Sequence, residues 1–210
     1  MTVVPSPPSE AGDAPPGGDA VVRAEAFVDA LAVYTADVRL DADGLETVLT
    51  HVASLEALGA GDDDGLEERT WHDGRFDLTA VVADEEYVGW CRSRGLDPDG
   101  FFRDLMRLEA LTMRENAERG LAVARAQLPE QRRQIEAMRQ AMGEEAFAQS
   151  VAAMEQAEAT LERSAATIGR LPRPTQGEQT LLDANRERIQ SALGELDEDE
   201  MGGVEAGSGS

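Results

Sequence analysis

The chain has 210 residues, of which 42 are acidic and 19 basic, so its formal net charge at neutral pH is −23. A chain this acidic is not expected to bind nucleic acid or an anionic membrane surface as a whole. Its single cysteine excludes an internal disulfide framework and a zinc site built on several thiolates. The length is that of one domain with a moderate hydrophobic core.

Every basic residue is arginine and none is lysine. Two origins stay open for this composition, namely GC-rich coding, which we favour, and adaptation to high salt. No apolar run approaches the roughly 20 residues of a membrane span, and Val3 and Val4 are followed directly by Pro5, so an apolar signal core is missing. We therefore expect a cytoplasmic protein, or a periplasmic or envelope-tethered one if a signal was removed.

Composition divides the chain into three parts. Residues 1–20 are rich in proline, glycine, serine and acid, so we expect them to be disordered. Residues 21–196 carry the helical patterns described below and should form one domain. Residues 197–210 combine acidic residues with glycine and serine, which predicts a disordered tail.

Two helices are predicted at the start of the domain, because apolar residues recur there at spacings of three and four. The first helix has Phe27, Leu31, Tyr34 and Val38 on one face. The second should begin at Asp41 or Asp43, end at Gly59, and present Leu45, Val48, Leu49, Val52 and Leu55.

The segment 67–82 admits two interpretations. Asp73-Gly74 lies between possible short strands, which is a hairpin signal, but an isolated hairpin is barely stable. An irregular loop held by Trp71 and Phe76 is the equal alternative. A short helix should then begin at Asp84 and end at Gly95.

Residues 97–171 read as two long helices folded back on each other. Asp97 and Pro98 suit the cap and the first position of the first long helix. Pro129 lacks an N–H and disfavours helical geometry at Leu128, so the sequence favours a turn there over a kink. The second helix would then pass through Gly143, at a cost of about 1 kcal/mol.

A last helix should follow Pro172 and Pro174. Thr175 and Glu178 have the spacing of a capping box. The apolar residues of this helix are Leu182, Ile189, Leu193 and Leu196. Together the patterns predict an all-α protein of about six helices, in which shorter helices pack across one end of a long antiparallel helical hairpin.

The order of these elements resembles a loosely defined group of uncharacterised helical bacterial envelope proteins, secreted or of the lipoprotein type. The residues that carry the resemblance are 26–31 (AFVDAL), 95–98 (GLDP) with 101–103 (FFR), and 181–189 (LLDANRERI). The resemblance implies a helical fold and an envelope location. It implies no activity, because no function is established for that group.

Catalytic candidates are few. His72 and Asp73 could act as a general base pair, although adjacent residues rarely point at one target, and Cys91 lies beside Trp90 on an apolar helix face. His51 lies at the margin of an apolar face. The chain has no phosphate-binding loop, dinucleotide-binding glycine pattern or nucleophile elbow. We expect neither an enzyme nor a bound cofactor or metal.

Six arginines lie in the segment around Pro129, namely Arg114, Arg119, Arg125, Arg132, Arg133 and Arg139. Their simplest role is in intrahelical ion pairs, such as those of Glu115 with Arg119 and Glu136 with Arg139. Alternatively, a turn at Pro129 would gather Arg125, Arg132 and Arg133 at the hairpin tip. Guanidinium groups there suit a partner with an acidic surface.

These observations favour a non-enzymatic helical interaction or scaffold protein, whose partner and oligomeric state the sequence does not specify. A small-ligand-binding helical bundle is the second hypothesis, and an enzyme that uses His72 and Asp73 or Cys91 is the third. A deep pocket with converging polar groups would favour the second hypothesis, whereas a solid core with an exposed apolar groove would favour the first.

Overall fold

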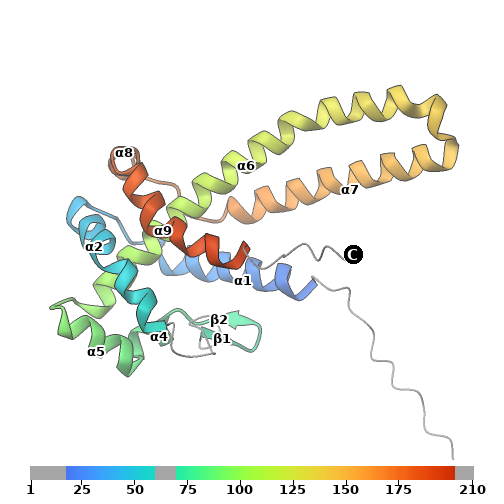
Figure 1. Ribbon diagram of the computed structural model, residues 1–210. Coiled ribbons are helices and arrows are strands. Elements are labelled where there is room, and N and C mark those ends of the chain that lie inside the picture. Colours follow the sequence, from blue (N-terminus) through green and yellow to red (C-terminus); the bar gives the residue numbers. More distant parts are fainter. Residues whose placement is uncertain (1–17, 60–69, 202–210) are drawn as a thin grey trace, which may run out of the picture.

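The computed structural model describes residues 18–59 and 70–201 (Figure 1). The predicted disordered segments 1–20 and 197–210 fall largely outside these ranges. Where they overlap the described residues, the structure shows helix. The first helix begins at Gly18 and the last ends at Met201, so both extend beyond the predicted limits of the domain.

The described residues form eight helices and one two-stranded sheet. The helices are α1 (Gly18–Tyr34), α2 (Ala42–Gly59), α4 (Thr79–Ala83), α5 (Glu85–Ser93), α6 (Pro98–Met142), α7 (Glu144–Ile168), α8 (Gln176–Ala184) and α9 (Arg186–Met201), and the strands are β1 (Trp71–His72) and β2 (Arg75–Phe76). The predicted architecture is confirmed, because α6 and α7 form a long antiparallel hairpin and the shorter helices pack at its open end (Figure 1).

The core surrounds the first four turns of α6. The predicted apolar stripe is buried there, with Phe101, Phe102, Leu105, Leu108 and Leu111. The other buried apolar side chains come from several elements and linkers, namely Val28, Leu31, Leu40, Leu45, Val48, Val52, Leu78, Val81, Tyr87, Trp90, Leu171, Leu182 and Ile189. The start of α6 is therefore the axis on which the shorter helices assemble.

The hairpin turns at Gly143, and the predicted turn at Pro129 is wrong. Helix α6 runs through Pro129 without interruption. Gly143 has a φ of +76°, a left-handed conformation that glycine adopts without strain. Pro129 is exposed, and its missing N–H removes only the hydrogen bond to the carbonyl of Arg125. A 45-residue helix can carry that local cost.

Three predicted helix starts and one predicted helix end are confirmed. Asp97 caps α6 through Gly100 N, with Pro98 in the first turn. The carboxylate of Asp41 accepts a hydrogen bond from Gly44 N at the start of α2. Thr175 and Glu178 form the reciprocal capping box of α8, and Gly95 closes α5 with a φ of +71°.

Of the two alternatives for the segment 67–82, the structure shows the hairpin, in which Trp71 pairs with Phe76. The Phe76 ring lies 5.3 Å from that of Phe27, so the hairpin packs against α1. One other expectation is wrong. The predicted single last helix is two, α8 and α9, because the chain breaks at Asn185. The Asn185 side chain donates a hydrogen bond to the Leu181 carbonyl, which competes with helix continuation.

Candidate interaction surface

Beyond the core, the two long helices project as a two-helix arm, defined as residues 118–142 of α6 and 144–165 of α7 (Figure 1). Apolar side chains meet between the helices, but only Met154 is buried within the arm. The half-buried apolar residues are Leu121, Ala124, Leu128, Ile135, Met142, Ala146, Phe147, Val151, Leu161 and Ala165. The arm therefore leaves much of its surface available to a partner.

One side of the arm carries a row of arginines on α6. Arg125, Arg132 and Arg139 are seven residues apart, so they lie along one line of the helix surface. We call them the arginine row. Arg132 Nη2 lies 2.7 Å from Glu158 Oε1 on α7, and the guanidinium of Arg139 lies 4.9 Å from the centre of the Phe147 ring. Both contacts cross from α6 to α7 on the same side of the arm.

Acidic side chains of α7 lie next to the arginine row. Glu155, Glu158 and Glu162 follow one another at spacings of three and four, so they share one face of α7. We call them the acidic row. Because Glu158 binds Arg132, the acidic row lies on the same side of the arm as the arginine row. A single surface thus presents a basic and an acidic line in parallel.

Three charged side chains on this surface form no ion pair in the described part of the chain. Arg125, Glu155 and Glu162 are exposed, and none of them forms an ion pair or a side-chain hydrogen bond within the described ranges 18–59 and 70–201. In contrast, the other arginines in the α6 part of the arm form ion pairs. Arg119 binds Glu115 at 2.9 Å, and Arg139 binds Glu136 at 3.2 Å, which confirms the intrahelical pairs expected from the sequence.

The structure separates the three arginines that the sequence grouped at a tip. Since the turn is at Gly143, Arg125, Arg132 and Arg133 lie along α6 rather than at its end. Arg125 and Arg132 belong to the arginine row. Arg133 lies one residue further on, about 100° around the helix, where its side chain is 75% exposed and pairs with Glu130 at 2.8 Å.

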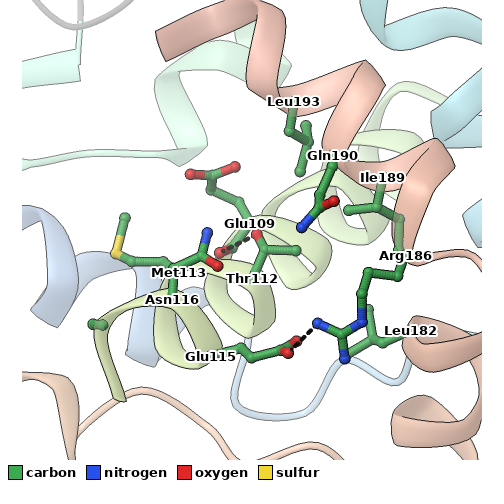
Figure 2. Close-up of a pocket in the computed structure, with 11 residues that line it drawn as sticks. Glu109, Thr112, Met113, Glu115, Asn116, Leu182, Arg186, Ile189, Gln190 and Leu193 are labelled. Carbon is green, nitrogen blue, oxygen red and sulfur yellow. Dashed lines mark hydrogen bonds and ion pairs between the residues drawn. The ribbon is translucent and has the colours of Figure 1, made fainter. Parts of the chain in front are cut away.

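A groove separates α6 from α8 and α9 (Figure 2). Its volume is about 500 Å³, and apolar side chains line it, among them Met113, Ile189 and Leu193. Arg186 forms an ion pair with Glu115 at one side of the groove (Figure 2). The groove is an open channel on the surface of the core and not an enclosed pocket.

Two arginines whose burial the sequence did not predict lie in the core, namely Arg107 and Arg114, and only Arg114 was among the six arginines singled out above. Arg107 forms a bidentate ion pair with Glu178, and Arg114 donates a hydrogen bond to the Leu171 carbonyl. The first contact holds α8, and the second holds the segment that links α7 to α8. Their position could have indicated burial, because both arginines fall within the apolar first half of α6. Their partners are 57 and 71 residues away, so the sequence could not identify them.

The catalytic candidates do not come together. His72 and Asp73 are exposed on the tip of the β-hairpin, whereas Cys91 is fully buried in α5. Burial raises the pKa of the Cys91 thiol and so disfavours the reactive thiolate. His51 packs edge-on against Trp90, with ring centres 6.3 Å apart. It lies at the core margin, as its position in the apolar pattern predicts.

The described part of the chain offers no candidate metal site and no candidate membrane span. No group of three or more histidine, cysteine, aspartate or glutamate side chains is placed to hold a metal ion among residues 18–59 and 70–201. Within the same ranges, no helix combines the length and the apolar character needed to cross a membrane.

Comparisons with protein-family models, curated proteins and solved structures found no match to this chain. The resemblance to helical envelope proteins stays a prediction.

Proposed function

We propose that this protein is a non-enzymatic helical interaction protein and that the arm is its binding element. The observation that carries the proposal is the side of the arm formed by the arginine row and the acidic row. Exposed charges on that side, Arg125 among them, have no partner in the described structure. The core end of the molecule is already filled by the shorter helices, whereas the arm extends away from it (Figure 1).

The α6 part of the arm has a net positive charge, unlike the chain as a whole. Residues 118–142 contain five arginines against three glutamates, although the whole chain has a net charge of −23. An acidic partner surface would be repelled by most of the molecule and attracted by this stretch of α6. Such contacts chiefly accelerate encounter and fix orientation. The excess of arginines in residues 118–142 therefore supports a partner with an acidic surface that docks on the arginine row.

Affinity capture with the full chain tests the proposal. The variant Arg125→Glu/Arg132→Glu reverses two charges of the arginine row. Its matched control is Arg119→Glu/Arg133→Glu, which makes the same change of charge at two exposed arginines of α6 that lie outside the row. We expect a bound protein that the wild type and the control retain and the row variant loses. Equal recovery with all three chains would refute the role of the row.

The groove between α6 and α9 favours a second candidate function, which is binding of a small amphipathic ligand. Its volume of about 500 Å³ lies within the range of ligand sites, and it combines an apolar floor with the polar side chains of Asn116 and Gln190. Leu193→Trp would fill the groove. If a ligand binds there, this variant should lose it in native mass spectrometry of the protein purified from cells, whereas Val123→Trp on the arm should retain it.

A further inference from the structure

We infer that the arm binds the arm of a second copy of this chain, with the arginine row of each copy over the acidic row of the other. This inference rests on the proposed function and names its partner. The acidic surface that the arginine row requires is present on the molecule itself, on α7. Glu155 and Glu162 are exposed and unpaired in the described structure, as is Arg125 on α6.

Symmetry makes the surface complementary to itself. A two-fold axis parallel to the arm brings the charged sides of two arms face to face, with α6 of each copy over α7 of the other. The basic line of one copy then meets the acidic line of its partner, in both directions. Every favourable contact occurs twice in such an isologous interface.

Small side chains on α7 allow the α6 helix of a second copy to approach closely. Ala159 lies between Glu155 and Glu162 on the same face of the helix, and Ala152 precedes them by one turn. Both alanines are exposed. Their short side chains leave room for the long arginine side chains of a facing α6 to lie flat along the helix. The half-buried apolar residues between the two helices, such as Val151, would lose further solvent contact.

The size of the arm is sufficient for a stable pair. A helix of 25 residues is about 37 Å long, and two neighbouring helices present a side about 20 Å wide. The contact would cover about 750 Å² on each copy. Stable protein complexes typically bury about 800 Å² on each partner. The arm therefore reaches the size of a specific interface without any contribution from the rest of the chain.

Charge exchange between two variants of the full chain tests the inference. The variants are Arg125→Glu and Glu155→Arg/Glu162→Arg, and the control is Arg133→Glu, which lies outside the arginine row. Native mass spectrometry and sedimentation equilibrium report whether the 22.5 kDa chain forms a species of twice that mass. We expect dimers for the wild type and the control, and a dissociation constant raised at least about tenfold for each row variant, because each now opposes like charges. An equimolar mixture of the two variants should restore the dimer.

Each other outcome overturns the inference. A monomeric wild type, a dimer that Arg125→Glu does not weaken, equal weakening by Arg133→Glu, or a mixture that stays monomeric would each contradict pairing through these rows. The proposed function has a separate test. If the wild type is monomeric but a captured protein depends on the arginine row, the arm is an interaction element whose partner is a different protein.

Discussion

Arg107 of α6 and Glu178 of α8 form a bidentate ion pair in which each side chain is 1% exposed. The Nε–Oε1 and Nη2–Oε2 distances are 2.8 and 2.9 Å. Glu178 also accepts hydrogen bonds from the backbone N–H groups of Leu40 and Thr175. One carboxylate thus joins the base of the arm to the α1–α2 linker and to the start of α8.

Removal of one member of this pair should strongly destabilise the fold. Arg107→Met leaves the Glu178 carboxylate buried without its counter-ion, and breaking such a pair typically costs about 3–5 kcal/mol of unfolding free energy. The double variant Arg107→Met/Glu178→Met should recover part of the loss. Chemical denaturation of both variants measures the effect.

The exposed pair of Arg170 with Asp29 provides the control. Its two side chains are 47% and 53% exposed, so Asp29→Asn should change the unfolding free energy by less than about 1 kcal/mol. A loss of that small size in Arg107→Met would show that the buried pair is not an important contact between α6 and α8.

The stability of the protein should fall in acid because of Glu178. Burial alone would raise the pKa of Glu178, but the hydrogen bonds from Arg107 and from backbone N–H groups outweigh burial and lower the pKa from 4.5 to about 2. The stabilisation is therefore complete above about pH 4.5 and is lost as the pH falls towards 2. Denaturation curves between pH 6 and 2 measure the decline, and the curve for Glu178→Gln should decline less steeply. Parallel curves would assign the acid sensitivity to other carboxylates.

Truncation of two phenylalanines should distinguish the core from the arm. Phe102 is 1% exposed, so Phe102→Ala should cost about 3–5 kcal/mol. Phe147 is half-buried at the end of the arm, where its ring contacts the Arg139 guanidinium. Phe147→Ala should therefore cost no more than about 2 kcal/mol. Denaturant titrations rank the two variants, and the opposite order would mean that the arm holds a major part of the core.

Two substitutions test where the hairpin turns. In a continuous helix, Pro129→Ala restores the hydrogen bond to the Arg125 carbonyl and should stabilise the protein by about 2 kcal/mol. Gly143→Ala forces a side chain into a left-handed conformation and should destabilise it by about 1 kcal/mol. Thermal unfolding measures both changes. If Pro129→Ala destabilises and Gly143→Ala does not, the chain turns at Pro129.

Local signals predicted the parts of the fold that depend on neighbouring residues. Asp97, Thr175 and Gly95 act as helix caps where their sequence contexts indicate, because capping involves groups within four residues of each other. The apolar stripe from Phe101 to Leu111 is buried for the same reason, since spacing along a helix determines its faces.

The hairpin turn was misplaced because two local signals compete. Pro129 and Gly143 both disfavour helix, and propensity alone penalises proline more. The chain turns at Gly143 and not at Pro129 because of contacts between residues that are distant in the sequence. A helix that continues past Pro129 keeps Ile135 and Met142 against α7 and places Arg132 on Glu158, 26 residues away.

The candidate surface was predicted in part. The sequence singled out the arginines of α6, but their common side with Glu155, Glu158 and Glu162 depends on how α6 and α7 pair, which follows from the position of the turn. The pair of Arg107 with Glu178 joins residues 71 apart. No local pattern specifies such a contact, although an arginine within an apolar stripe indicates that a buried partner is needed.

The most direct test of the account is photo-crosslinking from the two sides of the arm. Benzoylphenylalanine at position 159 replaces an exposed alanine between Glu155 and Glu162, and at position 157 it replaces an exposed alanine on the opposite side of α7. Irradiation of the full chain at concentrations where it associates should yield a covalent adduct of twice the chain mass from position 159 and none from position 157. An adduct from position 157 alone, or equal adducts from both, would contradict binding through the side that carries the two rows.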